Sequence, residues 1–423
     1  MHSPTLALIL TFASAKISGA LPTRRQDQFP ALPSLGGGGN TFQDSAHFRI
    51  YNAPSASTGS ATLAIMEAAH QCFVSELGWR TPGQSNNGGQ TGGPYKMNIY
   101  TVADNALGGS AGQQWADDAK GIPYLKVGKS WVSEPSVIVH EYGHAMHYSE
   151  KNWIGQTRTG AWWESIGNLI ADTYIATPTC AAARAAHGNL PAGPTLFDPK
   201  KVLGDSFQVL VDGTSGSGNY YQAWPFMTYI LNNPDNYPGC GKTVLLDMIR
   251  KYHINSNDTP LHSLEKLISG VSVQKVVGRY WARMAYVDIG HAKAQALFQE
   301  LRGQINYSNL DSSGNGKYTV KAARAPRYMG ANIVPLKVSG STVSVVVQCS
   351  GSYTATLVAR GGSAVRYVDL VNGNARIDLV GAEEVSFVFV NTPALVQYDA
   401  FSIPGDVNRG LGYSFQLTGA TVS

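Results

Sequence analysis

One stretch of the chain combines an apolar helical pattern with three ionisable side chains. It reads Val-Ile-Val-His-Glu-Tyr-Gly-His over residues 137–144 and follows a serine and a proline that are typical helix-start signals. The pattern predicts a helix over residues 135–149. Histidines four residues apart lie on one face of a helix, one turn from each other. Any fold of this chain must therefore place His140 and His144 side by side and give them a partner, since buried ionisable groups need one.

The residue types in this motif point to metal chemistry. Two imidazoles at this spacing can bind one Zn²⁺ at about 2.0–2.1 Å. Glu141 follows the first histidine, where its carboxylate can accept a proton from an attacking water molecule. With 10 His and 10 Glu among 423 residues, His-Glu-x-x-His is expected by chance only about 0.006 times per chain. The sequence therefore predicts zinc as the cofactor, His140 and His144 as ligands and Glu141 as the general base.

A third ligand is expected from a second helix. Glu164 lies 20 residues beyond His144 and begins an apolar helical pattern over residues 161–176. The alternative is an exposed glutamate that the helix dipole stabilises. Asn168 and Asp172 follow on the same stripe, so either could accept an imidazole N–H from a zinc ligand, and Asp172 is ranked first. Asp172 could instead bond a nearby loop, and it also stays open as an alternate third ligand.

This pair of motifs resembles the gluzincin class of zinc metallopeptidases, in which a glutamate ligand follows His-Glu-x-x-His. It is more similar still to secreted fungal-type proteins in which a tryptophan-rich helix carries that glutamate and a β-sandwich ends the chain. The resemblance covers residues 45–310 in the order of elements and is specific over residues 137–172. It implies the ligands and the base already named. Asn168 departs from the thermolysin-like pattern, which has an aspartate there.

Hydrolysis also needs a hydrogen-bond donor for the oxyanion that forms on the attacked carbonyl. Tyr221 is the candidate, because it begins a helix beyond the Gly/Ser-rich loop 213–218. A core aromatic explains this tyrosine equally well, and His253 and His262 are further candidates. His147 lies seven residues beyond the first ligand and cannot join both ligands in one tetrahedron. We expect it to be a hydrogen-bonded polar residue or part of a substrate subsite.

The N-terminal residues predict export from the cell. A short apolar run precedes Ser18-Gly19-Ala20, a site of the type that signal peptidase cleaves. The run is too short for a bilayer of about 30 Å. Residues 1–20 are therefore predicted to be a signal peptide and the protein to be secreted and extracellular. Residues 21–44 are predicted to be a propeptide or linker, with Arg24-Arg25 as a dibasic processing site or a solvated pair and Gly36–Gly39 as a flexible run.

Export changes how the four cysteines are interpreted. No Cys-x-x-Cys occurs, so a thiolate zinc finger is excluded. Two disulfides are plausible in an oxidising compartment, and a Cys180–Cys240 pair is preferred because both residues flank Pro/Gly-rich loops. Cys72 and Cys349 would then form the other pair. The Asn-x-Ser/Thr sequences at Asn257 and Asn306 predict glycosylation.

The composition changes near residues 311–317, a small, polar cluster expected to break regular structure. Before it, strands are predicted at residues 47–51 and 95–102. Helices are predicted at residues 61–77, 135–149, 161–176, 220–231, 243–252, 261–268, 271–285 and 291–301. Beyond it, strands alone are predicted, at residues 341–347, 353–358, 364–371, 375–380 and 385–390. Asn372-Gly373 predicts a hairpin between two of these strands.

These elements predict an α+β protein. A mixed α/β and helical, zincin-like catalytic domain is expected over residues 45–312. An all-β sandwich of about 100 residues is expected over residues 318–423.

Charge excludes one class of function. The chain has 32 Lys and Arg against 28 Asp and Glu, and three of the bases lie in residues 1–25, which leaves 29 against 28. No basic field remains for nucleic acid or anionic lipid. We therefore expect a monomer with no nucleic-acid or membrane partner.

The leading hypothesis for function is a secreted zinc metallopeptidase that acts on a protein or peptide, with a glycan as a further ligand of the sandwich. The first alternative is a non-catalytic glycan- or cell-wall-binding protein, which the intact Glu141 disfavours. The second is a zinc hydrolase of a non-peptide bond, which the motif alone does not exclude.

Overall fold

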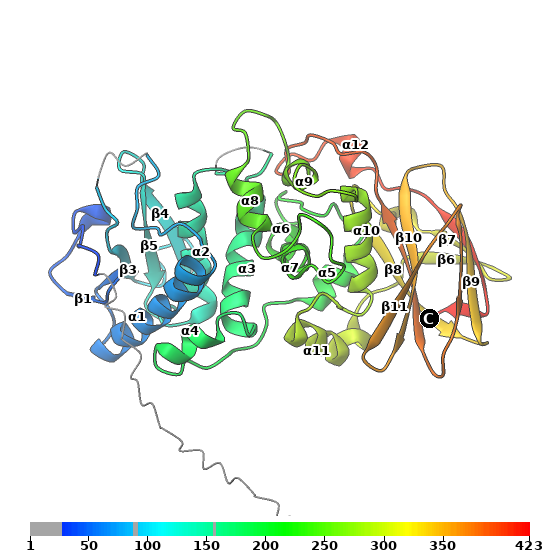
Figure 1. The fold of residues 1–423 in the computed structure, drawn as a ribbon, viewed down its shortest axis with the longest axis horizontal. Coiled ribbons are helices and arrows are strands. Elements are labelled where there is room, and N and C mark those ends of the chain that lie inside the picture. The colour runs from blue at the N-terminus through cyan, green and yellow to red at the C-terminus, as the bar shows by residue number, and fades with distance from the viewer. Residues whose placement is uncertain (1–27, 88–91, 155–157) are drawn as a thin grey trace, which may run out of the picture.

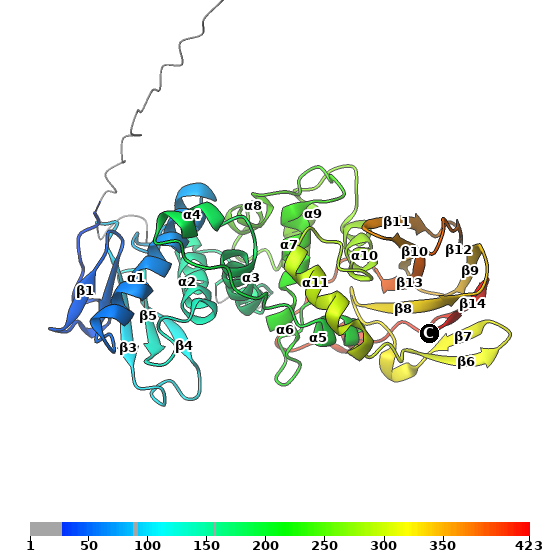
Figure 2. The same ribbon diagram turned by 90° about the horizontal axis from the view of Figure 1, so that it is seen from below.

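The computed structural model describes residues 28–87, 92–154 and 158–423. Three regions follow one another along its long axis: a mixed α/β region, a helical region and a pair of sheets (Figure 1). The second view shows the same order (Figure 2). The predicted α+β class is confirmed. The predicted signal peptide and the Arg24-Arg25 site lie outside the described residues.

The N-terminal region is built on a five-stranded mixed sheet with the order β1-β2-β3-β5-β4. Its strands are β1 (Phe42–Asp44), β2 (Phe48–Tyr51), β3 (Met97–Val102), β4 (Gly112–Asp117) and β5 (Ile122–Gly128). The three central strands are parallel, and β4 pairs antiparallel with β5 at one edge. The helices α1 and α2 pack against this sheet. One edge of the sheet, β4, is therefore left free beside α2.

Helices follow from the α/β region to the C-terminal sheets. They are α1 (Ala56–His70), which continues into the π-helix η2 (Gln71–Glu76), then α2 (Pro135–Glu150), α3 (Trp162–Ala176), α4 (Ala181–Ala186), α5 (Pro199–Gly204), α6 (Asn219–Gln222), α7 (Trp224–Asn232), α8 (Val244–Arg250), α9 (Pro260–Glu265), α10 (Val273–Met284) and α11 (Ala292–Leu301). Short 3₁₀ turns occur at η1 (Leu35–Gly37), η3 (Arg302–Gln304) and η4 (Ala322–Arg324). The predicted helix 220–231 is in fact two helices that meet at Ala223.

Two antiparallel five-stranded sheets form the C-terminal region, with the orders β11-β10-β13-β8-β15 and β12-β9-β14-β7-β6. Their strands are β6 (Leu310–Gly314), β7 (Lys317–Val320), β8 (Ala331–Val338), β9 (Thr342–Gln348), β10 (Tyr353–Gly361), β11 (Ala364–Asp369), β12 (Asn374–Asp378), β13 (Glu384–Asn391), β14 (Ser414–Thr418) and β15 (Ala420–Val422); the short helix α12 (Gly405–Asn408) precedes β14. Alternating apolar residues such as Val343, Phe387 and Phe415 fill the space between the sheets.

Two local predictions in this region need correction. Asn372 and Gly373 do adopt the positive φ values of a tight turn, 50° and 76°, and Val371 and Asn374 exchange two backbone hydrogen bonds across it. The predicted hairpin is limited to this one bridge, because beyond it β11 pairs with β10 and β12 with β9, in different sheets. The cluster at residues 311–317 is not a break but the hairpin of β6 and β7. Sandwich strands therefore begin at Leu310.

The helical region and the sandwich share a hydrophobic core. Ile333 and Val388 of the first sheet belong to the same buried cluster as the residues of α10. Trp281 of α10 donates its indole N–H to the Met329 carbonyl at 2.8 Å. Arg279 pairs with Asp369 of β11 at 2.9 Å. The first sheet is thus the middle layer between helices and the second sheet.

Residues 28–44 are part of the fold, so the prediction of a linker there is wrong. Leu35 is fully buried. Its carbonyl accepts the hydroxyl of Tyr100 at 2.5 Å and the side-chain N–H of Asn98 at 2.9 Å. Gly36 has φ 78°, and a Cβ there would lie 2.6 Å from the Tyr100 ring. Glycine is therefore required for close packing at this point.

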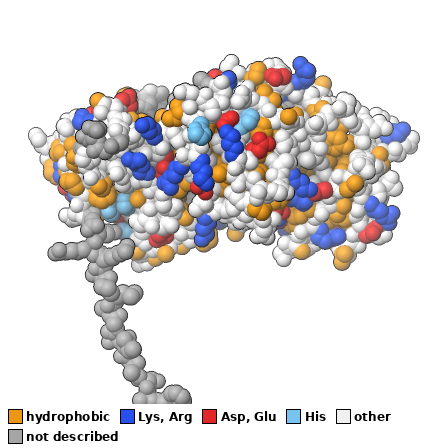
Figure 3. Space-filling view, turned by 45° about the horizontal axis from the view of Figure 1, so that its top comes forward, with side chains coloured by type: hydrophobic (Ala, Val, Ile, Leu, Met, Phe, Trp, Pro, Cys, Tyr) orange, Lys and Arg blue, Asp and Glu red, His pale blue; other side chains and the backbone are white. Residues whose placement is uncertain are grey.

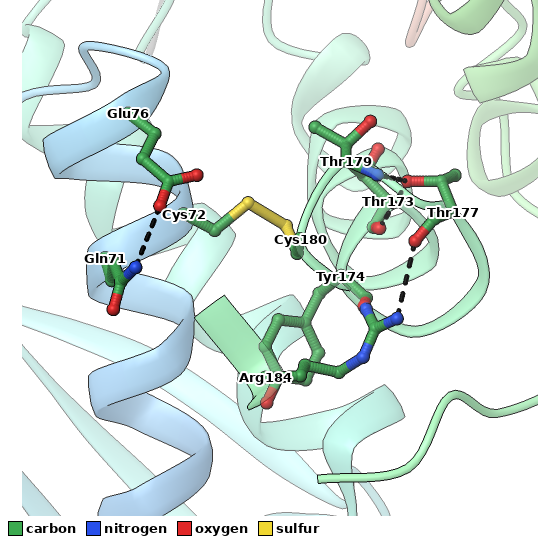
Figure 4. The surroundings of a disulfide bond; sticks show 9 residues. All are labelled: Gln71, Cys72, Glu76, Thr173, Tyr174, Thr177, Thr179, Cys180 and Arg184. Atoms are coloured by element: carbon green, nitrogen blue, oxygen red, sulfur yellow. Dashed lines mark hydrogen bonds between the residues drawn. A yellow bond between two sulfur atoms is a disulfide. The ribbon is translucent and has the colours of Figure 1, made fainter. Parts of the chain in front are cut away.

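The disulfide joins Cys72 to Cys180, with a Cα–Cα distance of 5.3 Å, so the predicted Cys180–Cys240 pair is wrong. Cys72 lies in η2 at the end of α1, and Cys180 precedes α4, which packs against α1 (Figure 4). Cys240 and Cys349 are free and half-buried. A second bridge is therefore absent from the described residues. The side chains of Asn257 and Asn306, the predicted glycosylation sites, are exposed.

Charged side chains of both signs are scattered over the face shown in Figure 3. Among the described residues, oppositely charged side chains form pairs such as Arg250 with Glu150 and Lys251 with Asp247. Among residues 28–87, 92–154 and 158–423, no helix has both the length and the apolar character needed to cross a membrane.

Candidate metal centre

The helix α2 carries the predicted motif along the free edge of the N-terminal sheet. Pro135 lies in its first turn, and the Glu134 carboxylate accepts the N–H of Ser136 as an N-cap. One side of the helix is apolar and fully buried, and it includes Ile138, Val139, Tyr142 and Met146. This packing fixes the rotation of α2. The histidines and Glu141 are therefore directed to a groove beside α3 and β4.

A pair of glycines lets α3 cross α2 closely. A Cβ on Gly143 would lie 3.0 Å from the Ile170 Cβ and 3.3 Å from the Gly167 Cα. Larger residues at these positions would push the helices apart. The close approach brings Glu164, in the first turn of α3, next to the two histidines of α2.

The three predicted ligands lie together. Nε2 of His140 is 3.1 Å from Oε2 of Glu164, and Nε2 of His144 is 3.5 Å from the same oxygen. One ligand atom from each residue lies within 4.8 Å of the others. The two imidazole rings are nearly perpendicular, at 86°, with centroids 4.5 Å apart. Their Nε2 atoms therefore converge on one point beside the carboxylate.

The residues fit a zinc ion. Two imidazole nitrogens and one carboxylate oxygen form the ligand set that catalytic zinc prefers, with a position left open. A Cβ on Gly167 would lie 2.7 Å from Cε1 of His140 and 2.9 Å from Cε1 of His144. This glycine therefore leaves the space that the two rings need.

The electrostatics of the cluster favour the ligand form that a metal requires at two of the three residues, His144 and Glu164. Burial lowers the pKa of His144 to about 4, and the charge of His140 adds to this effect. Burial alone would raise the pKa of Glu164, but its hydrogen bonds and ion pairs with the two histidines lower it to about 2. For His140, burial acts to lower the pKa, yet the neighbouring carboxylates, Glu164 above all, raise it overall. His144 is thus neutral and Glu164 ionised at neutral pH, as ligands must be.

Glu141 lies beside the cluster with its carboxylate toward β4. It is only 7% exposed, and burial raises its pKa to about 7; His140 opposes this rise and the charge of Glu164 adds to it. A Cβ on Gly112 would lie 2.7 Å from its Cγ. The backbone N–H of Gln114 also stabilises its charged form. A carboxylate with a pKa near neutrality can accept a proton at neutral pH and later return it.

Asn168, and not Asp172, contacts a predicted ligand. Oδ1 of Asn168 is 2.9 Å from Nδ1 of His140. Asp172 is buried elsewhere: its Oδ1 accepts the Thr195 hydroxyl and the Leu196 N–H, each at 2.7 Å, and its Oδ2 is 2.5 Å from Nε2 of His291. At about 100° and 1.5 Å per residue, Asp172 is rotated about 80° and displaced about 12 Å from Glu164. The prediction that Asp172 orients a zinc ligand is therefore wrong, as is its alternate role as third ligand.

A groove of about 850 Å³ passes over the cluster. It is lined by Gly109–Trp115, Ser136, Val137, His140, Glu141, His144, Trp163, Glu164 and Tyr221. The Tyr221 ring is 40% exposed, and burial together with the charges of Glu164 and Glu141 raises the pKa of its hydroxyl. The structure thus places Tyr221 at the groove, and its role as a donor to substrate stays a prediction. His253 and His262 do not line it; the His262 ring instead caps α9.

His147 is a core residue. It is fully buried, and burial lowers its pKa to about 3. Its ring packs against Trp163, with centroids 5.1 Å apart. The prediction that it forms part of a substrate subsite is therefore wrong.

Several residues that shape the site were not predicted from the sequence. The Trp163 ring stacks on the His144 ring, with centroids 4.5 Å apart and an angle of 9° between the planes. The sequence signal for this contact was the position of Trp163 next to Glu164. Gly167 lies between Glu164 and Asn168 on a helix where a glycine is costly, which is also a signal. No sequence signal pointed to Gly112 and Gln114, because the polar residues of β4 do not show the alternation of a half-buried strand.

No protein-family model matches the chain, and no curated protein has a matching sequence. The zincin-like character of the site therefore rests on its own geometry, the His140, His144 and Glu164 cluster with its His-x-x-x-His spacing and downstream glutamate.

Proposed function

We propose that this protein is a secreted zinc-dependent peptidase. The observation that carries the proposal is the convergence of His140, His144 and Glu164 at 3.1–3.5 Å, with Glu141 beside them and a groove above them. A protein that only bound glycans would have no use for a buried carboxylate with a near-neutral pKa at a metal site.

The free edge of β4 supports a peptide as substrate. Ala111 accepts the N–H of Gly128 from the neighbouring chain segment at 2.9 Å. Because hydrogen-bonded residues alternate along an antiparallel pair, Gly112 and Gln114 turn their backbone groups to the free edge. The Gln114 N–H there interacts with Glu141, which leaves the Gly112 groups and the Gln114 carbonyl for a peptide. An extended peptide can add to such an edge through main-chain hydrogen bonds. This edge lies over Glu141, so a bound peptide would pass the cluster.

The residues that line the groove also indicate which substrate side chains it would accept. Apart from the cluster and Glu141, the described residues that line it are uncharged, and two of them, Trp115 and Tyr221, are exposed aromatics. We therefore expect cleavage beside uncharged side chains, with aromatic or apolar ones preferred.

The chain's own residues supply the remaining chemistry. When bound, a zinc ion would polarise the scissile carbonyl and acidify water. Glu141 accepts the proton of the attacking water on its carboxylate and returns it to the leaving amine. Tyr221 donates its hydroxyl proton in a hydrogen bond to the oxygen that becomes negative. Trp163 covers the His144 ring and limits the access of bulk water.

Cleavage of an unbiased peptide library tests the proposal. Zinc-loaded wild type should cleave peptides, and a chelator should abolish cleavage. Glu141→Gln should retain zinc and folding but lose at least about 1,000-fold in rate, since the amide cannot accept the proton. Glu134→Gln, an exposed residue on the same helix, is the matched control. Absence of peptide cleavage by the wild type would refute the peptidase assignment, and a fully active Glu141→Gln would refute the role of Glu141 as the general base.

A further inference from the structure

The segment of residues 213–222 contacts α3, the helix that carries Glu164, through two backbone carbonyls. It consists of a Gly/Ser-rich loop and the single helical turn α6. A turn this short leaves its carbonyls without partners inside the helix. Side chains of α3 supply them: Ser165 donates its hydroxyl to the Tyr220 carbonyl, and Nδ2 of Asn168 donates to the Tyr221 carbonyl at 2.7 Å.

The Tyr221 carbonyl determines which way the Asn168 amide faces. A carbonyl can only accept, so the NH₂ group of Asn168 must face it, and Oδ1 must face His140. Oδ1 can only accept, so Nδ1 of His140 must carry a proton. Nδ1 protonation leaves Nε2, 3.1 Å from Glu164, as the nitrogen with a lone pair for a metal. The Tyr221 carbonyl thus determines, through Asn168, which tautomer His140 adopts.

We propose that Asn168 is a positioning residue that couples metal binding at His140 to the ordering of the Tyr221 segment. The inference rests on the proposed metal site. When Asn168 holds both groups, a metal that requires the Nδ1–H tautomer of His140 also stabilises the Asn168 rotamer that anchors Tyr221 over the groove. By linkage, order in the segment strengthens metal binding to the same extent.

An amide is needed at this position, and this need explains why the residue is asparagine. An aspartate could accept from His140 equally well, and its charge would increase the basicity of that ligand. It has no proton to donate to the Tyr221 carbonyl, and two acceptors facing each other at this distance repel. Only asparagine serves both neighbours at once.

The experiment compares wild type with Asn168→Asp, Asn168→Ala and Ser165→Ala in the full chain. Zinc affinity is measured by competition with a chromogenic chelator. Hydrogen–deuterium exchange of residues 213–222 is measured with and without zinc. In the wild type, zinc should slow exchange in this segment.

Each variant has a distinct expected result. Asn168→Asp should bind zinc at least as tightly as wild type, but its segment should exchange about five-fold faster or more, and zinc should no longer slow it. Asn168→Ala should bind zinc about 10–100-fold more weakly. Ser165→Ala should loosen the segment, and zinc should still slow its exchange because Asn168 is intact; by the same linkage, zinc affinity should fall, but by less than in Asn168→Ala.

The inference is overturned if zinc slows exchange equally in wild type and Asn168→Asp, or if Asn168→Ala binds zinc as tightly as wild type. Failure of the proposed function has a different signature, because the wild type itself would then bind no zinc in the chelator titration.

Discussion

Gly167 determines whether the two imidazoles can converge. A Cβ at this position would lie 2.7–2.9 Å from atoms of both rings, so Gly167→Ala must displace at least one of them. We expect zinc affinity to fall by about ten-fold or more while the fold persists, since a displaced ligand loses its coordination geometry. Chelator competition and circular dichroism measure the two effects. Gly303→Ala, where nothing lies within 4 Å, is the control. Unchanged zinc affinity in Gly167→Ala would contradict this view of the site.

His70 makes stability depend on pH. It is 6% exposed and stacks on His47, with centroids 3.8 Å apart. Burial lowers its pKa to about 3, and the charge of His47 contributes. In the unfolded chain its pKa is about 6.5. Between these values the unfolded state binds more protons, so stability must fall as the pH decreases from about 6.5 toward 3.

Urea unfolding of wild type and His70→Phe at pH 7, 6, 5 and 4 isolates this effect. Phenylalanine keeps the aromatic stack but cannot bind a proton. The free energy of unfolding of the wild type should fall more steeply below pH 6.5, by at most about 1.4 kcal/mol per pH unit relative to the variant. Parallel curves would show that His70 has no such role.

Site residues whose roles follow from their spacing along the chain were predictable. Site residues whose roles depend on how the helices pack against each other were not. His140, His144 and Glu141 follow from one helical turn, and Glu164 from its distance along the chain. The choice between Asn168 and Asp172 depended on how α3 is rotated against α2, which Gly143 and Gly167 determine. The position of β4 over Glu141 depended on sheet order, which no local pattern encodes.

At the scale of elements, the long helices α1, α2, α3 and α10 and the strands β9, β10 and β13 were predictable from periodicity, whereas the apolar strand β8 was not predicted. The strands β4 and β5 were missed because Gln113, Gln114 and Lys126 interrupt any alternation. The turn at Asn372-Gly373 was predictable as a turn. Its two strands enter different sheets, because each pairs with a strand distant in sequence. The residues of the turn therefore determine its tight geometry, but they do not determine which strands β11 and β12 pair with.

The disulfide ties η2 to the start of α4 across 108 residues of chain. Closing a loop of this length in the unfolded state is worth about 4–5 kcal/mol in the loop-entropy account. The double variant Cys72→Ser/Cys180→Ser should therefore lose roughly 3–5 kcal/mol of unfolding free energy by urea titration. Cys349→Ser, at a free cysteine, should change it little. Peptide mapping that found Cys180 joined to Cys240 would contradict the pairing.

At the scale of the whole molecule, we expect the helical region and the sandwich to unfold as one unit, because they share a core. The two regions are connected by the segment between η3 and β6, where Asn306 and Ser308 are exposed. A protease cut there should give two fragments that elute together and melt in a single transition. Gel filtration and calorimetry of the cut protein measure this. Two fragments that separate and melt independently would show that the regions are autonomous domains.

The central claim is that His140, His144 and Glu164 bind one zinc ion, and elemental analysis of the purified full chain tests it most directly. Wild type and the exposed control Glu134→Gln should each retain about one zinc per chain, as a three-ligand site predicts. His144→Ala and Glu164→Gln should retain less than about a tenth of that amount after the same dialysis. A wild type without zinc, or variants that keep it in full, would contradict the claim.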